Sequence, residues 1–270
     1  MKPVKIGKLL AYTTVAAGGL LLVFPFVWMF LSAFKTREEL VAFTFLPRQF
    51  RLDNFYEVLS NSLFLRWYAN SLIVALTVTA CVLIFSSMAG YAIAKFRFRF
   101  RNLIFFMILS TMMIPVEMLI IPWYILGQEL IDTYTGIALP GLISAFGVFL
   151  MRQSADQVPD SILESARVDG AGEFRIFFQI VLPMLNPSLA PLGIFFFLGN
   201  WNAFLWPLII TNTSTMFTLP VGLQYYSGQH SNEFHLIMAA SCFTVIPVLI
   251  VFVFLQKHII KGVTMSGIKG

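Results

Sequence analysis

Six long apolar runs constrain this chain more than any other feature of its sequence. A helix needs about 20 apolar residues to cross the hydrocarbon core of a bilayer. The runs are apolar on all sides rather than alternating, which favours helices over barrel strands. The sequence therefore predicts an all-α integral membrane protein with six transmembrane helices. The predicted spans are residues 9–34, 69–94, 103–126, 134–151, 189–210 and 236–256, of which the fourth is the shortest and contains Pro140.

The composition supports this class and argues against others. Hydrophobic residues make up 58% of the chain and charged residues only 11%, whereas soluble domains have about 25% charged residues. Cys81 and Cys242 both lie in apolar runs, so we interpret them as buried hydrophobes rather than as a disulfide or a metal site. We expect no nucleic-acid binding, because the net charge of +5 is better explained by membrane orientation.

The placement of lysine and arginine predicts the orientation. If the N-terminus is cytoplasmic, 13 of the 18 basic residues lie inside and 5 lie outside. The positive-inside rule therefore predicts that both termini are cytoplasmic. The expected organisation is a cytoplasmic N-terminus (1–8), a six-span domain (9–256) and a cytoplasmic C-terminal tail (257–270). A loop at 152–188 is then cytoplasmic, and segments 35–68, 127–133 and 211–235 face outward.

The loop at 152–188, between the fourth and fifth spans, is expected to form a helix–turn–helix. Pro159 suits the first turn of a helix and Gly170 suits its C-terminal end. A second short helix follows and ends at Pro183; its apolar face, which could anchor it to the bundle, consists of Phe174, Phe177, Phe178 and Val181. An amphipathic hairpin on the bilayer surface is one interpretation. Five acids against three arginines fit a protein partner better than an anionic leaflet.

This loop resembles the signature of permease subunits of bacterial ABC importers. The signature is Glu-x-Ala-x-x-x-Gly, nine residues, then Ile-x-Leu-Pro. The matching residues are Glu164, Ala166, Gly170, Ile180, Leu182 and Pro183. Ser165 stands where alanine is usual, and Asp169-Gly170-Ala171 is the form common in the sugar-importer branch. Segments 113–122, 132–134, 201–207, 218–223 and 261–270 also resemble that branch, specifically the six-span subunit of a two-permease, maltose-type carbohydrate importer.

The resemblance implies a machine of several chains in the bacterial cytoplasmic (inner) membrane. An extracytoplasmic solute-binding protein delivers solute, and a second permease subunit completes the pathway as a heterodimer. Two ATP-binding cassette subunits hydrolyse ATP with Mg²⁺. This chain lacks the Gly-x-x-x-x-Gly-Lys-Ser/Thr phosphate loop. It is therefore expected to bind no cofactor itself and not to be an enzyme.

The resemblance also assigns the ATPase-coupling residues: Glu164, Ser165, Ala166, Asp169, Gly170, Ala171, Ile180, Leu182 and Pro183. Exposed carboxylates can accept charge-assisted hydrogen bonds from a partner, and a glycine lets the backbone turn at little steric cost. The alternative is that Glu164 only pairs with Arg167, three residues further along the helix, which is worth about 0.2–0.5 kcal/mol.

Two groups of residues are candidates for the solute pathway. Glu117 is the only acid within a predicted span; a charge there costs about 2.5–3.5 kcal/mol and usually faces a cavity or a partner. Near the outer end of its span it could instead reach solvent. The second group is Asn200, Trp201, Asn202 and Trp206, whose amides and indoles suit sugars. The alternative is that the asparagines bond across helices and Trp206 belongs to the interface belt.

Other functions were weighed against a sugar importer. A glycerol-3-phosphate or polyol importer is the nearest alternative, but no predicted span contains a lysine or arginine for a phosphate. A stand-alone secondary transporter would carry an internal repeat, and none is evident. A membrane-embedded enzyme would need clustered polar residues, whereas His230, His235 and His258 are scattered.

Overall fold

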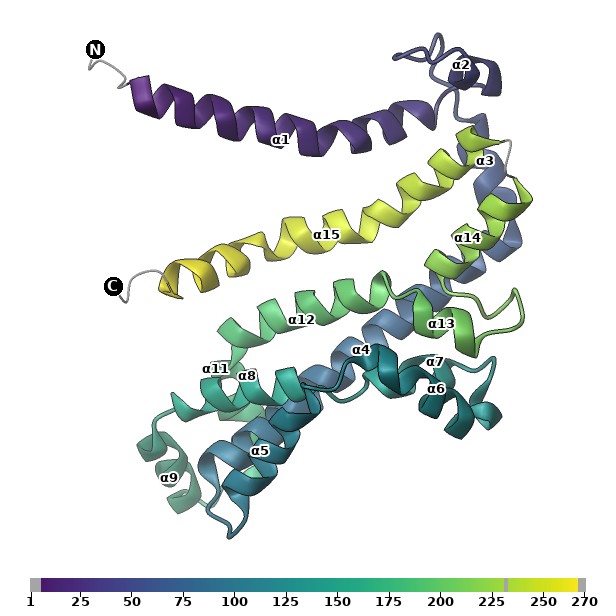
Figure 1. The fold of residues 1–270 in the computed structure, drawn as a ribbon. Coiled ribbons are helices and arrows are strands. Elements are labelled where there is room, and N and C mark those ends of the chain that lie inside the picture. Colours follow the sequence, from purple (N-terminus) through teal and green to yellow (C-terminus); the bar gives the residue numbers. More distant parts are fainter. Residues whose placement is uncertain (1–5, 231–232, 267–270) are drawn as a thin grey trace. The chain divides into compact units, whose positions relative to one another are not determined.

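The computed structural model describes residues 6–230 and 233–266, and within these residues the chain is built from helices (Figure 1). It divides into two compact units. The first unit contains residues 1–65 and 223–247, and the second contains residues 66–222 and 248–270. The expectations for residues 1–5 and 267–270, at the ends of the predicted cytoplasmic termini, lie outside the described residues.

The first unit is held together by aromatic side chains. It contains α1 (Ile6–Ser32), α2 (Arg37–Val41), α3 (Asp53–Ser60) and parts of α14 (Leu219–Gln229) and α15 (Phe234–Ser266). Phe55 packs against Phe34 and Phe243, with ring centroids 5.0 and 5.8 Å apart. The buried Asn54 donates to the carbonyl oxygens of Ala33 and Lys35 at 2.8 and 3.0 Å. These contacts join α3 to the end of α1 and to α15.

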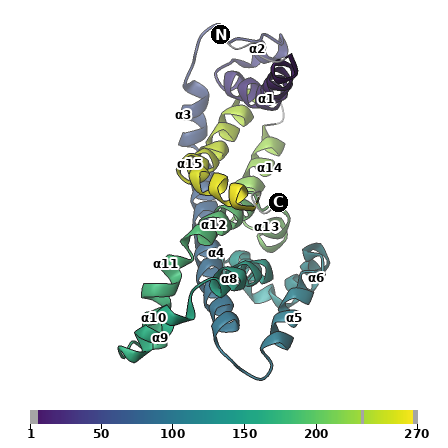
Figure 2. The same cartoon turned by 90° about the vertical axis from the view of Figure 1, so that its left-hand side faces the viewer.

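The second unit contains most of α4 (Ser62–Lys95) and the helices that follow it. They are α5 (Arg101–Thr111), α6 (Val116–Leu126), η1 (Gln128–Leu130), α7 (Tyr134–Ala138), η2 (Leu139–Gly141), α8 (Ala145–Asp156), α9 (Asp160–Val168), α10 (Glu173–Ile176), the π turn η3 (Phe177–Val181), α11 (Leu182–Met184), α12 (Asn186–Trp201) and α13 (Leu205–Ile210). Within this unit α9 lies at one end and α13 at the other (Figures 1 and 2).

Helix α4 is the element on which the second unit packs. Its buried residues join one hydrophobic cluster with α7 and α13 and another with α5 and α8. Gly90 permits a close approach to α8, because a Cβ atom there would lie 2.6 Å from the backbone nitrogen of Arg152. Small residues at helix interfaces in membranes allow this kind of packing.

Among the residues that the structure describes, three helices are long and apolar enough to cross a membrane: Leu10–Ser32, Ser62–Lys95 and Phe234–Phe254. Three further helix pairs meet the same test only as bent pairs, which gives up to six spans. The first two pairs correspond to the third and fourth predicted spans, and they bend by 95° and 50°. The predicted span 103–126 is therefore not one continuous helix. Proline explains the break, since Pro115 cannot donate a helical hydrogen bond and disfavours helical geometry at the residue before it.

The fifth predicted span, 189–210, is also interrupted. Helix α12 begins at Asn186 and ends at Trp201, and α13 restarts at Leu205. Pro207 accounts for the restart, because its ring clashes with a helical carbonyl four residues earlier, at Ala203. On its other side α12 forms a pair bent by 80° with the helical segment Glu173–Met184, so the loop at 152–188 leads directly into α12.

Candidate functional site

The first helix of the polar loop is α9, which starts and ends as expected from its sequence. Pro159 is its N-cap and Asp169 its C-cap. Gly170 has φ +80°, a left-handed conformation that glycine adopts without strain. The N–H of Gly170 donates to the Arg167 carbonyl and that of Ala171 to the Ala166 carbonyl, both at 3.0 Å. This is a Schellman cap, so the Ala-x-x-x-Gly spacing is the spacing that ends a helix with a glycine.

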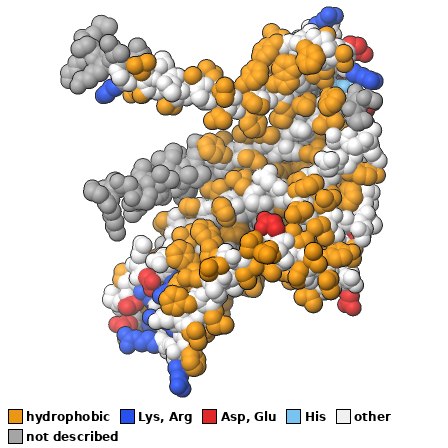
Figure 3. All heavy atoms as spheres, viewed as in Figure 1, with side chains coloured by type: hydrophobic (Ala, Val, Ile, Leu, Met, Phe, Trp, Pro, Cys, Tyr) orange, Lys and Arg blue, Asp and Glu red, His pale blue; other side chains and the backbone are white. Residues whose placement is uncertain are grey.

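The second helix continues further than expected. It runs from Glu173 to Met184 through the π turn, one residue beyond Pro183. Phe177 is buried, whereas Phe174 and Phe178 are 72% and 48% exposed. The expectation that all three phenylalanines anchor this helix is therefore wrong: Phe177, Ile176 and Val181 do so. Exposed charged side chains of both signs gather around α9, in contrast to the largely hydrophobic surface over α5 (Figure 3).

The start of α9 is tied to the end of α4. Lys95 Nζ donates to the Val158 carbonyl at 2.6 Å and to Asp160 Oδ1 at 2.8 Å. The Lys95 side chain is 9% exposed and that of Asp160 is 74% exposed. The hydrogen bond from Lys95 and its charge lower the pKa of the Asp160 carboxyl. Lys95 therefore holds the chain just before α9 in place and adds a charge interaction at the first residue of the helix.

The end of α9 is tied to α10 and α4. Arg167 Nε and Nη2 donate to the two carboxylate oxygens of Glu173, at 2.7 and 3.3 Å. The Tyr91 hydroxyl donates to Glu173 at 3.2 Å. Hydrogen bonding to Glu173 raises the pKa of Arg167. The alternative pairing of Arg167 with Glu164 is therefore wrong, because Glu173 occupies the guanidinium.

The remaining signature residues fall into an outward and an inward set. Glu164, Asp169 and Pro183 are exposed, and Ser165 Oγ donates within α9 to the Ser161 carbonyl at 2.9 Å. Four side chains are partly buried against the hydrophobic cluster that contains Leu163, Ile176, Phe177 and Val181. They belong to Ala166, Ala171, Ile180 and Leu182. Val168, beside the cap, is 87% exposed. The loop thus exposes the carboxylates of Glu164 and Asp169 together with apolar groups. The helix that carries them is held by hydrogen bonds at both ends.

A cavity of about 550 Å³ lies among α4, α5, α6, α8, α12 and α13. Asn200 and Trp206 line it, together with Trp123. The Trp206 indole donates to the Gly136 carbonyl at 3.1 Å and meets the Trp123 ring edge to face, with centroids 5.9 Å apart. The structure therefore brings two of the five predicted pathway residues to one cavity.

The other three predicted pathway residues are not among those that line this cavity. Trp201 is 2% exposed and packs against the rings of Tyr68 and Phe197. Asn202 is the exposed C-cap of α12, and its amide bonds to Leu198 of the same helix at 2.8 Å. Glu117 is exposed in the first turn of α6. Asn202 and Trp206 are four residues apart, which would place them on one face of a continuous helix. They do not share a face, because the chain leaves helical geometry between them.

Sequence reasoning missed Trp123 as a lining residue and a polar cluster around Asn70. Asn70 donates to the carbonyl oxygens of Thr215 and Phe217 and accepts from the Tyr134 hydroxyl at 2.7 Å. Asp132 accepts from the backbone N–H groups of Asn212 and Thr213 at 2.8 and 3.0 Å. An asparagine within an apolar run was the available signal, since an amide buried there needs partners, and Asn70 is fully buried.

Known proteins are similar to this chain in sequence. The family described as "Binding-protein-dependent transport system inner membrane component" matches residues 82–265. The chain is 40% identical over 259 residues to the arabinooligosaccharides transport system permease protein AraQ of Bacillus subtilis, covering 93% of this chain and 92% of that protein. It is 32% identical over 268 residues to the sn-glycerol-3-phosphate transport system permease protein UgpE of Escherichia coli, covering 95% of each.

Solved structures share the fold. A chain of a bacterial ABC transporter involved in the import of the acidic polysaccharide alginate superposes with a TM-score of 0.85 at 24% identity, over 94% of this chain and 96% of that one. A chain of the alginate transporter in complex with alginate pentasaccharide-bound periplasmic protein gives a TM-score of 0.66 at 13% identity, over 92% of both chains.

Proposed function

The chain belongs to the family of binding-protein-dependent transport system inner membrane components, and we propose that it carries a sugar or an oligosaccharide. It is a multi-pass permease subunit of an ABC importer and not an enzyme, since ATP hydrolysis resides in separate subunits. A second permease subunit, two ATP-binding cassette subunits and an extracytoplasmic solute-binding protein complete the transporter. Both termini of this chain lie in the cytoplasm.

The lining of the 550 Å³ cavity supports an uncharged solute. An indole face packs against the C–H side of a sugar ring. The Asn200 amide donates one hydrogen bond to the Phe196 carbonyl at 2.8 Å, which leaves its second N–H and its oxygen for hydroxyl groups. None of the residues that line the cavity in the described part of the chain is charged. A phosphate ester would need a cation there, because a buried charge without a partner is costly. This observation favours sugars over glycerol-3-phosphate, although a permease for the latter is 32% identical.

The hairpin from α9 to α11 is the surface that couples transport to the ATPase subunits. The residues assigned to it are Glu164, Ser165, Ala166, Asp169, Gly170, Ala171, Ile180, Leu182 and Pro183. Glu164 and Asp169 are exposed carboxylates on a helix that is fixed at both ends. They can accept charge-assisted hydrogen bonds from a partner, and the exposed Val168 and Phe174 add apolar contact area.

Coupling follows from the position of α4. Lys95 and Tyr91, near the end of α4, hold the hairpin. Val74 of the same helix lines the solute cavity. Lys95 and Val74 are 21 residues apart, which corresponds to roughly 32 Å of helix. A displacement of the hairpin by the ATPase subunits therefore moves the helix that forms one wall of the cavity.

The hydrogen bonds that join α4 to the hairpin are the main observation in support of this function. Reconstitution of the full transporter tests it. The wild-type chain is expected to co-purify with an ATP-binding cassette subunit and to support ATP-dependent uptake of an oligosaccharide supplied with its binding protein. Uptake of glycerol-3-phosphate but not of sugars would replace the proposed solute. Transport by this chain without any ATPase subunit would overturn the importer assignment.

A further inference from the structure

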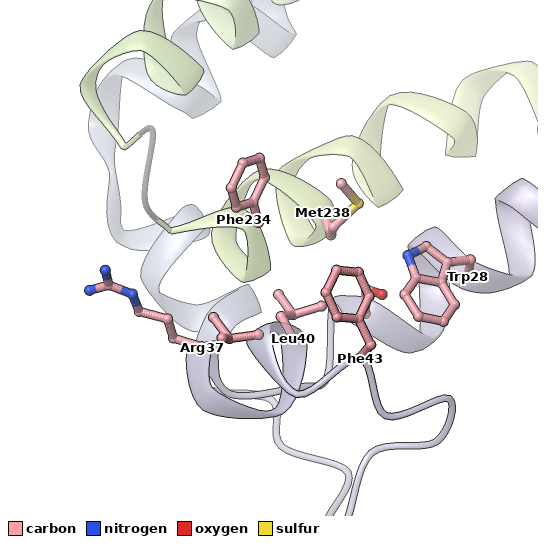
Figure 4. A pocket seen from close by; sticks show the side chains of 8 residues that line it. Trp28, Arg37, Leu40, Phe43, Phe234 and Met238 are labelled. Atoms are coloured by element: carbon pink, nitrogen blue, oxygen red, sulfur yellow. The ribbon is translucent and has the colours of Figure 1, made fainter.

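A second cavity lies in the first unit, where the end of α1, α2 and the start of α15 meet (Figure 4). Its volume is about 390 Å³, within the range of sites for small molecules. The residues that line it are Trp28, Ser32, Arg37, Leu40, Val41, Phe43, Phe234 and Met238. Arg37 lies at one end and Trp28 at the other, with Leu40, Phe43 and Met238 between them (Figure 4).

This lining is apolar apart from two polar side chains that have no partner. Ser32 is fully buried, and its Oγ makes no hydrogen bond. Arg37 is exposed and forms no ion pair or hydrogen bond through its side chain with any other described residue. Buried hydroxyl groups are almost always hydrogen-bonded in folded proteins. The cavity therefore offers one cation that forms no hydrogen bond or ion pair with described residues, one unbonded hydroxyl and an apolar wall.

Neighbouring charged groups are already engaged. Lys35 Nζ donates to the Thr44 carbonyl at 2.7 Å and lies 4.2 Å from the centre of the Trp28 ring. The Glu39 carboxylate accepts from the backbone N–H groups of Thr36 and Arg48. Glu38 lines a separate, polar hollow, and its carboxylate interacts electrostatically with Arg37 without a hydrogen bond between the two side chains. Arg37 is thus the cation available to a ligand of this cavity.

The cavity also lies at the level of a membrane surface. Ser32 ends the candidate span Leu10–Ser32, and Phe234 begins the candidate span Phe234–Phe254. Two spans therefore reach the same membrane face here. Tryptophan is enriched at this depth of a bilayer, and Trp28 is one of the residues that line the cavity. Lipid phosphates and glycerol esters occupy this level of a bilayer.

We propose that this cavity binds an anionic phospholipid of the surrounding membrane. The lipid phosphate pairs with Arg37, an ester carbonyl accepts a hydrogen bond from Ser32 Oγ, and an acyl chain lies against Leu40, Phe43 and Met238. An apolar side chain from a protein partner would fill the same space but would leave the Ser32 hydroxyl unpaired. A phospholipid satisfies all three parts of the site. This site is independent of the identity of the transported solute.

Native mass spectrometry of the complete transporter tests the proposal. The complex is taken from nanodiscs that contain equal amounts of phosphatidylglycerol and phosphatidylcholine, and the retained lipids are counted. Wild-type protein is expected to retain phosphatidylglycerol in preference. Arg37→Gln is expected to lower the preference for phosphatidylglycerol about tenfold, which corresponds to the loss of one charge-assisted hydrogen bond. Arg48→Gln, an exposed arginine of the same segment outside the cavity lining, is the matched control.

Ser32→Ala and site-specific crosslinking provide a second readout. Ser32→Ala keeps the side-chain volume nearly constant and is expected to weaken retention of the lipid several-fold. A photoreactive residue in place of Val41, which lines the cavity and is 73% exposed, is expected to capture phospholipid. Capture of a polypeptide instead would show that a protein segment fills the cavity and would overturn the proposal. Equal retention of both lipids by wild-type protein, or an unchanged preference in Arg37→Gln, would also overturn it.

Discussion

Lys95, the last residue of α4, forms an ion pair of 2.8 Å with Asp160, the first residue of α9. The pair joins a long helix that borders the proposed solute cavity to the short helix that carries the proposed coupling residues. The same lysine also satisfies the Val158 carbonyl in the connection before α9. This one side chain therefore links the helices that carry the two proposed functional regions of the second unit.

Replacement of Lys95 should uncouple transport from ATP hydrolysis. Lys95→Met keeps the length of the side chain but removes both hydrogen bonds, at a cost of about 1–3 kcal/mol for the unsatisfied carbonyl. We expect the ATPase subunit to stay bound while the amount of solute imported per ATP hydrolysed falls several-fold. Arg99→Gln, an exposed residue in the segment that follows α4, should leave this ratio unchanged. A normal ratio in Lys95→Met would show that the tie transmits no motion.

The Lys95–Asp160 pair should make the start of α9 sensitive to acid. The pKa of Asp160 is lowered in the folded protein from its ordinary value of 3.8, chiefly by the hydrogen bond from Lys95. The stabilisation is therefore complete above 3.8 and is lost as the pH falls through the lower, folded pKa. Hydrogen exchange of the α9 amides should show greater protection in wild type than in Asp160→Asn at neutral pH. The two should converge under acid, and convergence near neutral pH would contradict this assignment.

Gly170 and Gly172 form a matched pair for testing the helix cap. A Cβ atom at either position meets no atom within 4 Å, but Gly170 has φ +80° and Gly172 has φ −70°. Gly170→Ala should cost about 1–2 kcal/mol of local stability and weaken co-purification of the ATPase subunit, whereas Gly172→Ala should do neither. Gly170→Asp should be more severe, because it also adds a negative charge to the docking surface. Full insertion with normal uptake in Gly170→Asp would argue against a coupling role.

Asn200 and Asn202 separate a cavity residue from a surface residue two positions away. Asn200 lines the 550 Å³ cavity, whereas Asn202 is exposed outside that lining. Asn200→Ala should raise the solute concentration needed for half-maximal uptake by about 2- to 13-fold, the loss of one hydrogen bond worth 0.5–1.5 kcal/mol. Asn202→Ala should have the smaller effect. Docking of the ATPase subunit should survive both changes, and a larger effect of Asn202→Ala would place the pathway elsewhere.

Gly90 should tolerate no side chain. A Cβ atom would lie 2.6 Å from the backbone of Arg152, so α4 and α8 would have to separate. We expect Gly90→Ala to destabilise the protein by about 1–3 kcal/mol, seen as a lower midpoint of thermal unfolding in detergent. Gly199→Ala in α12 meets no atom within 4 Å and should not lower that midpoint. An unchanged midpoint in Gly90→Ala would mean that the two helices can move apart at little cost.

Much of this protein could be predicted without coordinates because the relevant signals are local. Apolar runs of sufficient length predict helices in lipid, since hydrocarbon cannot hydrogen-bond to an exposed backbone. The limits of α9 followed from Pro159 and Gly170, whose backbone preferences act within one or two residues. The signature of the coupling loop is also contiguous in sequence. These features depend on interactions between near neighbours in the chain.

Tertiary structure decided which distant groups meet. Sequence spacing alone suggested Glu164 for Arg167, but folding of the hairpin places Glu173 against that guanidinium instead. A proline can break a helix, but the angle of the resulting bend depends on packing between distant elements. A single break after Trp201 sends Asn202 away from Trp206, since a change of one backbone torsion redirects every later side chain. The sequence by itself therefore determined the membrane class and the limits of α9, whereas long-range packing determined the cavity lining and the hydrogen bonds that join the loop to α4.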